Sequence, residues 1–419
     1  MNSAQHSCTI SSSVLPSDGE RSAERRGFAP WPSYLEEEIS AAISVLRSGK
    51  VNYWTGEQGQ KFEQEFAEFC GTKYAVAVAN GSVALELALL ALGIGPGSEV
   101  IVPSRSFIAS ASCALVRGAK PVFADVDPVS QNLTVDSIRE VWSPRTRAII
   151  AVHLAGWPCD MDSIMEFARQ HSLFVIEDCA QAHGAKYNGR RVGSLGHIAA
   201  FSFCQDKIIS TGGEGGMVVT NNAVLWERMW SYKDHGRDFS LSRTPAGTGF
   251  RWIHNNFGTN LRLTELQSAI GRIQLRDIDQ QLDNRRRHAA VLTSNFSRVS
   301  GLRVTIPAPH IAHAYYKYYA FVEPQKLSGK WDRDRISAAI CEEGVPCSSG
   351  SCSEIYLEQA FPREMRPVRR HRHARELGET SLMFMVHPTL TPQNMLDTCR
   401  TVEKIMRVAA YSGTASVAA

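Results

Sequence analysis

The sequence predicts an α/β protein with a mostly parallel central sheet flanked by helices, followed by a smaller α+β C-terminal domain. Two observations lead to this prediction. Short aliphatic and β-branched runs alternate with amphipathic stretches through the first half of the chain, which is typical of parallel sheets covered on both faces. A long helical region, residues 264–296, then leads into a segment of mixed strands and helices. We therefore expect a disordered leader (1–26), a large domain (27–285) and a small domain (286–419).

The composition excludes several classes of protein. The chain has 419 residues, of which 43% are hydrophobic and 21% charged, so it is neither collagen-like, coiled-coil nor wholly disordered. Its net charge of +3 gives no overall field that would draw it onto nucleic acid or anionic lipid. No run reaches the ~18 apolar residues of a membrane span, and the first residues lack the apolar block of a secretory signal. We expect a cytoplasmic protein.

The cysteines predict neither disulfides nor a metal site. The chain has 10 of them and no C-x-x-C pair, so free thiols are expected. Cys341, Cys347 and Cys352 lie close together but without a suitably spaced histidine.

The N-terminal region predicts a leader and two helices. Residues 1–26 are Ser-rich and have no apolar period, so we expect them to be disordered. A helix is predicted at 33–46, with Ser33 as its cap and acidic residues in its first turn. A second is predicted at 61–70, ended by Gly71.

The alternating region begins at residue 74. Apolar runs predict strands at 74–80, 99–103, 120–126, 148–153 and 173–178. The stretches between them predict helices at 83–92, 108–116, 135–142 and 161–171. Two further strands, 197–203 and 215–220, and a helix starting near Val224 follow. Because ligands of such sheets bind at the carboxyl ends of the strands, functional residues should come directly after the apolar runs.

The small domain shows fewer regular patterns. Strands are predicted at 302–307 and 315–324, and a helix at 332–344. The second strand holds four tyrosines, of which at most two could reach a substrate if side chains alternate along it. They are Tyr315, Tyr316, Tyr318 and Tyr319.

Two glycine-rich segments do not predict nucleotide binding. Residues 93–97 (GIGPG) follow a helix and precede a strand, which is the reverse of a dinucleotide-binding loop. Residues 210–216 (STGGEGG) lack the G-K-[ST] ending of a P-loop. Both are interpreted as turns.

Three other positions suggest chemistry, although each also fits an ordinary structural role. Ser82 opens a helix directly after a strand, where free N–H groups could bind an anion or simply be capped. Asp178 ends a strand and could face a cation or cap a turn. Lys207 lies in a tight loop, where a lysine can lose its proton and form a Schiff base, although most lysines lie at the surface. Together, in this order on an α/β frame, they outline a pyridoxal phosphate site.

The chain resembles the DegT/DnrJ/EryC1/StrS family of pyridoxal phosphate-dependent aminotransferases of fold type I, which act on keto sugars attached to nucleotides and on keto-cyclitols. The resemblance runs from Trp54 to His387. It rests on the motifs WTGEQGQKFEQEFAEFCG, NGSVALELAL, EVIVPSRSFIASA, HLAGWPCDMDSI, VIEDCAQAHGA, FSFCQDK, TGGEGGMVVT and GTNLRLTELQSAIG.

The resemblance implies a role for each matching residue. Lys207 corresponds to the lysine that binds the cofactor and moves a proton, and Asp178 to the partner of the pyridine nitrogen. Gln181 matches a contact to the phenolic oxygen, and Phe107 the aromatic side chain stacked on the ring. Other matching positions form the phosphate cradle: Ser82, the backbone N–H of Val83, and Ser202. Asn260 matches an asparagine that reaches the phosphate in the neighbouring subunit, which implies a homodimer with shared active sites.

The implied reaction transfers an amino group from glutamate or glutamine to a ketone on a sugar, in two half-reactions with ping-pong kinetics. We favour a nucleotide-linked keto sugar, with a cyclitol of the scyllo-inosose type as the alternative. Related dehydratases have histidine where this chain has Lys207, which argues against dehydration. A cofactor-binding regulator without turnover is the alternative outside enzymes, but the leader is too short for a helix-turn-helix domain.

Some further residues have open interpretations. His183 could be structural or catalytic, and Trp54 and Trp157 could line a pocket or serve packing. The arginines of residues 366–375 could hold a nucleotide diphosphate or lie on a solvated helix start.

Overall fold

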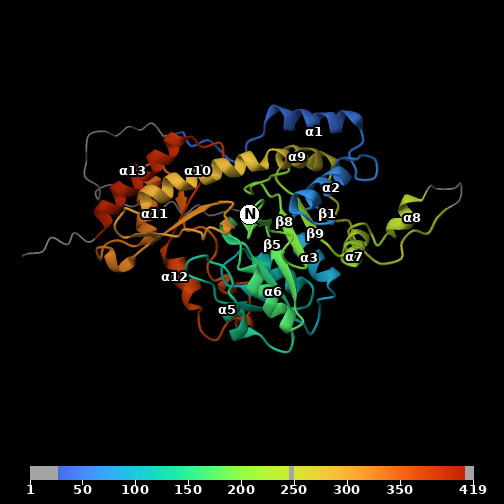
Figure 1. The fold of residues 1–419 in the computed structure, drawn as a ribbon, viewed down its shortest axis with the longest axis horizontal. Helices are drawn as coiled ribbons and strands as arrows, with labels where there is room; N and C mark the ends of the chain where they lie inside the picture. The colour runs from blue at the N-terminus through green and yellow to red at the C-terminus, as the bar shows by residue number, and fades with distance from the viewer. Residues whose placement is uncertain (1–26, 245–249, 411–419) are drawn as a thin grey trace, which may run out of the picture.

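The computed structural model describes residues 27–244 and 250–410, and the leader expected at 1–26 lies outside them. Figure 1 shows a large domain and a small domain connected by the long helix α10 (Ile278–Phe296). The division expected between residues 285 and 286 falls within this continuous helix and stays a prediction.

The large domain is built on a seven-stranded sheet with the order β1-β9-β8-β5-β4-β2-β3. Its strands are β1 (Tyr74–Val78), β2 (Glu99–Pro103), β3 (Lys120–Ala124), β4 (Thr146–Val152), β5 (Phe174–Asp178), β8 (Ile198–Ser202) and β9 (Gly216–Thr220). Strand β9 is antiparallel to β1 and β8, and the other neighbours pair in parallel. The predicted mostly parallel sheet is confirmed. Every strand except β9 ends at the same edge.

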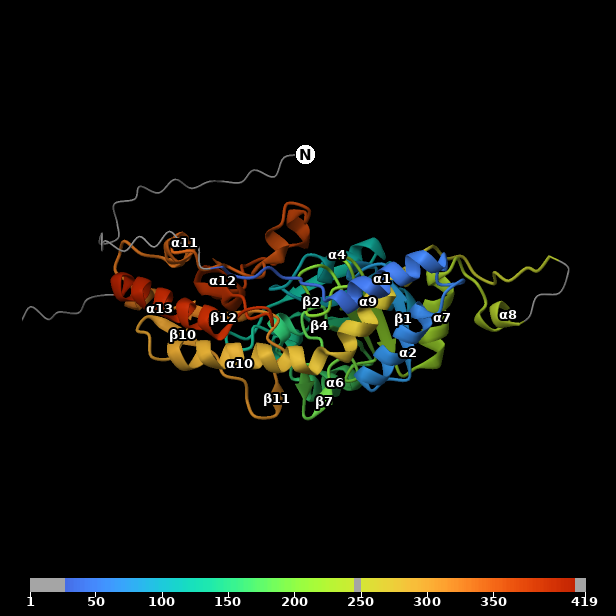
Figure 2. The ribbon, with the colours of Figure 1, turned by 90° about the horizontal axis from the view of Figure 1, so that it is seen from above.

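Helices cover both faces of this sheet, because alternate strand residues point to opposite sides. Ile149 faces a core shared with α2, α5 and α6, whereas its neighbour Ile150 faces a core shared with α3, α4 and α7. These helices are α2 (Gln58–Cys70), α3 (Gly81–Ala91), α4 (Ala109–Val116), α5 (Val135–Val141), α6 (Met161–Gln170) and α7 (Ala223–Lys233). Figures 1 and 2 show α1 (Glu36–Ser48) lying along α9 (Glu265–Arg276) outside these layers, and α8 (Phe239–Arg243) far from the centre.

Local sequence explains several helix ends. The Asn80 side chain accepts a hydrogen bond from the N–H of Val83 at 3.0 Å and so caps α3. Gly71 ends α2 with a φ of 74°, a left-handed conformation that glycine adopts at little cost. Thr264 caps α9 through the N–H of Gln267.

The small domain has a four-stranded antiparallel sheet with the order β10-β12-β14-β13. Its elements are β10 (Leu302–Val304), β12 (Tyr318–Val322), α11 (Arg333–Glu342), β13 (Cys347–Ser348), α12 (Arg372–Thr380), β14 (Ser381–Phe384) and α13 (Pro392–Ala409). Helices α10, α11 and α13 share a core with one face of the sheet, and α12 packs against the other (Figure 1).

Two predicted helices have different bounds. Helix α1 begins at Glu36 rather than near Ser33, because the carboxylate of Glu38 accepts a hydrogen bond from the N–H of Leu35 and closes the first turn. The long helical region expected at 264–296 consists of two helices, α9 and α10, which meet at Asp277.

The strand expected at 315–324 is shorter than predicted. Tyr315 has a left-handed φ of 48°, so the chain turns there and pairs in the sheet only from Tyr318. The side chains of Tyr315 and Tyr316 therefore do not continue the alternation of β12.

A small hairpin escaped the prediction. Strands β6 (Lys186–Tyr187) and β7 (Arg190–Arg191) are joined by Asn188 and Gly189, with φ values of 50° and 77°. Strand β11 (Ile311–Ala312) pairs with β6 and so brings the start of the small domain to the large one. Asn-Gly is the common sequence of such two-residue turns.

None of the helices in the described residues is long and apolar enough to cross a lipid bilayer. The cysteines of the described ranges are all free thiols.

Candidate active site

A cavity of about 930 Å³ lies between the two domains, at the edge where the strands of the large sheet end; we name it the interdomain cavity. Asp178 ends β5, Ser202 ends β8 and Asn80 follows β1, so three strands present polar groups to it. The small domain contributes the opposite side. Its lining residues are Tyr316, Lys317, Tyr319, Gly350, Ser351, Cys352, Met383 and Met385.

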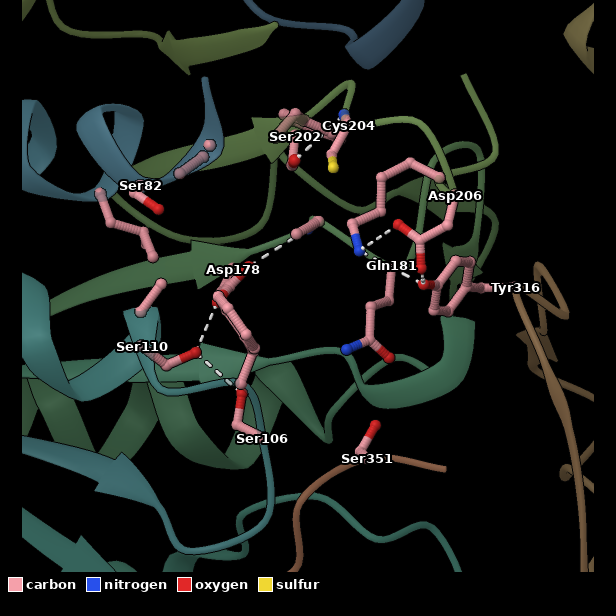
Figure 3. A pocket seen from close by; sticks show the side chains of 18 of the residues that line it. Ser82, Ser106, Ser110, Asp178, Gln181, Ser202, Cys204, Asp206, Tyr316 and Ser351 are labelled. Atoms are coloured by element: carbon pink, nitrogen blue, oxygen red, sulfur yellow. Dashed lines mark hydrogen bonds and ion pairs between the residues drawn. The ribbon is translucent and has the colours of Figure 1, made fainter. Parts of the chain in front are cut away.

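One end of the cavity is formed by the N-terminus of α3 facing Ser202 (Figure 3). The first N–H groups of a helix have no acceptor within the helix, which makes its N-terminus suited to an anion. Asn80 occupies the N–H of Val83, so this predicted phosphate contact is already used by the cap, whereas Ser82 is exposed to the cavity. A β-carbon at Gly81 would lie 2.5 Å from the Ser202 β-carbon, so glycine permits this close approach.

We expect Gly81→Ala to weaken the binding of pyridoxal phosphate about tenfold, because relieving the overlap with Ser202 moves α3 away from β8. Titration of the apoprotein, followed by absorption of the bound cofactor, measures the affinity. Gly329→Ala is the control, since a β-carbon there meets nothing within 4 Å. Equal affinities of Gly81→Ala and the unchanged protein would place the phosphate site elsewhere.

Asp178 forms the floor of the cavity. One carboxylate oxygen accepts a hydrogen bond from the Ser110 hydroxyl at 2.8 Å, and the other accepts from the N–H of Ala180 at 3.2 Å. Ser110 is in turn 2.8 Å from the hydroxyl of Ser106 (Figure 3). Burial raises the pKa of Asp178 above its usual value, with these hydrogen bonds opposing the change. A cationic group placed next to this carboxylate would therefore be strongly favoured.

Lys207 lines the cavity, and its amine is held by Asp206 and Tyr316, which Figure 3 labels. The Nζ atom is 3.0 Å from the Asp206 carboxylate and 3.2 Å from the Tyr316 hydroxyl, and that hydroxyl also donates to Asp206. Burial tends to raise the pKa of Asp206, but the Lys207 charge and the Tyr316 hydroxyl outweigh it and lower the pKa. The Lys207 carbonyl accepts a hydrogen bond from the indole of Trp31 at 2.8 Å, which ties the lysine loop to the N-terminal segment.

Gln181 and Phe107 also line the cavity. The amide oxygen of Gln181 accepts a hydrogen bond from the N–H of Ala155 at 2.8 Å, which leaves its NH₂ group to donate to a ligand. The Phe107 side chain is 65% exposed, unusual for a phenylalanine, and is available to stack on a planar ligand.

Asn260 does not line the interdomain cavity of its own chain. It is exposed, and its backbone forms an isolated antiparallel β-bridge with Asp234. Its side chain accepts a hydrogen bond from the N–H of Arg262 at 3.3 Å.

The residues with open interpretations lie outside the cavity lining. Trp54 packs edge-on against Trp230, and Trp157 is buried against His313. Within the arginine-rich segment 366–375, most side chains are engaged by acceptors of the same domain. The pairs are Arg366 with the Phe361 carbonyl, Arg370 with Glu354, Arg372 with Glu376, and Arg375 with Glu379.

His183 is fully buried against the rings of Phe201 and Phe203, whose centroids lie 5.4 and 5.7 Å from its own. Burial, assisted by the nearby charge of Lys207, lowers the pKa of His183 from 6.5 to about 3. The histidine is therefore neutral in the folded protein, and it packs against the core rather than lining the cavity.

We expect this burial to make the folded protein less stable as the pH falls below 6.5, because His183 takes up a proton in the unfolded chain but not in the folded one. At pH 5 the lost free energy of unfolding is about 2 kcal/mol. Urea unfolding at pH 7 and pH 5 measures it, and His183→Phe should reduce the loss by this amount. Equal losses in both proteins would contradict the assignment.

A second polar network beneath the site has the composition of a metal site. Ligand atoms of His153, Glu177 and Cys179 lie within 4.8 Å of one another. The Nδ1 atom of His153 accepts from the N–H of Cys159 at 3.0 Å, and its Nε2 faces the Glu177 carboxylate at 3.0 Å. That carboxylate also accepts from the N–H groups of Gly193, Leu195 and Gly196. These protein partners satisfy the network, which joins β4, β5 and the following loop.

The sequence did not indicate Asp206 or Lys317, and it offered Tyr316 only as one of four tyrosines of which at most two could reach a substrate. Asp206 directly precedes the lysine in FSFCQDK, but nothing in the pattern indicates that it points to the same side. Tyr316 and Lys317 come from the small domain and meet Lys207 only through the fold. The sequence indicated only a helix for Ser110, which lies in the first turn of α4, three residues after the predicted ring contact Phe107.

The cavity fits pyridoxal phosphate. The exposed N-terminus of α3 suits the phosphate group. Among the described residues, the hydrogen-bond partners of the Asp178 carboxylate are uncharged, so this carboxylate suits a protonated pyridine nitrogen. The Lys207 amine opens to the same space.

Comparison with known proteins agrees with this geometry. Residues 32–403 match the model of the DegT/DnrJ/EryC1/StrS aminotransferase family. A GDP-perosamine synthase of Caulobacter vibrioides is 44% identical over 295 residues, which are 67% of this chain and 76% of the relative. The crystal structure of an aminotransferase from Psychrobacter cryohalolentis is 50% identical, with a TM-score of 0.89, and the match covers 91% of this chain and 99% of that one.

A third relative was solved with a reaction intermediate bound. The crystal structure of DesV from S. venezuelae, in complex with a ketimine intermediate, is 33% identical, with a TM-score of 0.80. The match covers 88% of this chain and 94% of that one. The chain belongs to the DegT/DnrJ/EryC1/StrS aminotransferase family and is a pyridoxal phosphate-dependent aminotransferase.

Proposed function

We propose that this aminotransferase moves an amino group from glutamate or glutamine to a keto sugar linked to a nucleotide. The observation behind the proposal is the Lys207 amine, held by Asp206 and Tyr316 in the interdomain cavity near the buried carboxylate of Asp178. The similarity to a GDP-perosamine synthase supports the class of acceptor.

In this proposal Lys207 binds the cofactor and moves the proton at the reacting carbon. When bound, pyridoxal phosphate takes up the amino group and stabilises negative charge at that carbon. Asp206 and Tyr316 orient the amine through their contacts at 3.0 and 3.2 Å. Asp178 holds a proton on the ring nitrogen.

The remaining site residues position the cofactor. Gln181 donates its free NH₂ group to the phenolic oxygen, and Phe107 covers the ring. Ser82, Ser202 and the N-terminus of α3 hold the phosphate, and the N–H of Val83 contributes only if it is shared with Asn80. Donor and acceptor use the same cavity in turn, which gives ping-pong kinetics.

The test separates the two classes of acceptor. The protein is first treated with glutamate or glutamine and freed of the donor, and is then mixed with a GDP- or UDP-linked keto hexose or with a keto-cyclitol such as scyllo-inosose. We expect only the nucleotide-linked ketones to restore the absorption of the aldehyde form of the cofactor. Restoration by the cyclitol alone would contradict the proposed acceptor.

We further propose that the protein is a homodimer in which Asn260 serves the partner's active site. Asn260 is exposed and does not line the cavity of its own chain, and the segment before it exposes large aromatic side chains. These are Phe250 (80% exposed), Trp252 (83%) and Phe257 (100%). Such a surface is typical of an interface.

Complementation tests this arrangement. Asn260→Ala and Lys207→Ala subunits are mixed, dissociated and reassociated. If Asn260 acts across the interface, one site of each mixed dimer has both residues intact, and activity returns. Activity no greater than the sum of the separate variants, or a monomer in analytical ultracentrifugation, would contradict the proposal.

A further inference from the structure

Lys317 is a second lysine of the interdomain cavity, and the mechanism above does not use it. It lies between Tyr316 and the start of β12, half-buried, and lines the cavity from the small domain. Its amine is 3.2 Å from the sulfur of Met385 and 4.8 Å from the centre of the Tyr316 ring. A thioether is a weak acceptor, so the ammonium is poorly satisfied.

The charged groups around Lys317 do not balance the positive charge of its ammonium. Asp206 is the acidic one, and its carboxylate is already engaged by Lys207 and the Tyr316 hydroxyl. Lys207 and the buried Arg285 repel it. The pKa of Lys317 is lowered to about 8, mainly by burial. A partly buried ammonium without a direct anionic contact gains most when an anion enters the cavity.

The residues that line the cavity around Lys317 indicate how much charge that anion carries. Among the described residues that line the cavity from the small domain, the others have uncharged side chains; they are Tyr316, Tyr319, Gly350, Ser351, Cys352, Met383 and Met385. A diphosphate has more than one negative charge and is usually held by several cationic groups. A single ammonium beside methionines suits a single carboxylate.

The position of Lys317 indicates where that carboxylate belongs. The Lys317 and Lys207 amines lie 4.8 and 5.0 Å from the centre of the same Tyr316 ring, so they are at most about 10 Å apart. The donor amino acid reacts at the place of the Lys207 amine, and its α-carboxylate is attached to the carbon that reacts. This upper limit is compatible with contact between the Lys317 amine and a carboxylate of the bound donor.

We propose that Lys317 binds a carboxylate of the amino donor and thereby selects amino acids for the first half-reaction. The α-carboxylate is the group that glutamate and glutamine share. This inference rests on the proposed function of the cavity.

The experiment compares Lys317→Met with Lys317→Arg, which keeps the charge, and with Lys330→Met as the control at an exposed lysine. Each protein is loaded with pyridoxal phosphate, and the absorption change is followed in single turnovers at increasing glutamate or glutamine. We expect the donor concentration for half-maximal rate to rise about 10- to 100-fold in Lys317→Met. It should be largely restored in Lys317→Arg and unchanged in Lys330→Met, and the acceptor KM should stay constant in all of them.

A second measurement does not depend on turnover. Glutarate, which has carboxylates but no amine, is titrated against the loaded proteins, and we expect it to bind at least tenfold more weakly to Lys317→Met. Unchanged donor and glutarate binding would overturn the inference, and so would a rise confined to the acceptor KM. If the unchanged protein reacts with neither donor, the proposed function fails, and glutarate binding still decides the role of Lys317. Lys317→Gln replaces Lys317→Met should the latter fail to load the cofactor.

Discussion

Replacing Lys207 with alanine is expected to leave a folded protein that binds pyridoxal phosphate without a covalent link and transaminates at least 10³-fold more slowly. The amine is both the nucleophile and the proton carrier, and positioned proton transfer alone contributes about 10²- to 10⁴-fold. Borohydride reduction followed by peptide mass spectrometry locates the covalent attachment, and steady-state kinetics give the rate.

Two variants control for other effects of this change. Lys207→Arg keeps a positive charge beside Asp206 and Tyr316 but cannot form the covalent link, so it should be as inactive as Lys207→Ala. Lys186→Ala, in the hairpin of β6, should retain the link and the rate. A reduced cofactor found on a lysine other than Lys207 would contradict the assignment.

Asp178→Asn is expected to slow transamination by about 10²- to 10³-fold. Asparagine has the shape of aspartate and can still meet Ser110, but it has no charge to stabilise a proton on the ring nitrogen. Breaking a buried charge pair in this way costs about 3–5 kcal/mol. Single-turnover kinetics with glutamate measure the loss, and cofactor titration shows a parallel decrease in affinity.

A cofactor analogue makes this prediction specific. Pyridoxal phosphate methylated on its ring nitrogen keeps a permanent positive charge, so with it the rates of Asp178→Asn and the unchanged protein should converge. Ser110→Ala removes one neutral donor to the carboxylate and should cost about tenfold or less. A variant Asp178→Asn with full activity would show that the carboxylate does not act on the cofactor.

Much of the fold could be predicted because it depends on local patterns. The alternation of apolar runs and helical stretches indicated the sheet, a strand end indicated Asp178, and the family resemblance indicated Ser202; both residues line the cavity. The sequence allowed an ordinary cap at this helix start without naming the residue, and the structure shows that Asn80 caps it and occupies the N–H of Val83, which the family resemblance assigned to phosphate.

What could not be predicted depends on contacts between distant parts of the chain. Tyr316 reaches Lys207 because Tyr315 adopts a left-handed φ of 48° and turns the chain before β12. No sequence pattern predicts a left-handed φ at a tyrosine. The alternating tyrosines instead predicted a strand that begins at Tyr315. The weak contact between the Lys317 amine and the Met385 sulfur likewise depends on the fold, because Met385 follows β14, far from Lys317 in the sequence.

The interdomain cavity is complete only after most of the chain has been synthesised. Its lining begins at Asn80 and ends at Met385, and Lys207 lies near the middle of this interval. A nascent chain that has released the large domain from the ribosome still lacks the wall that holds the Lys207 amine and closes the site. Contacts over such long sequence separations form late in folding. A chain interrupted before the small domain is made therefore lacks one side of the cavity and the Tyr316 contact to the Lys207 amine.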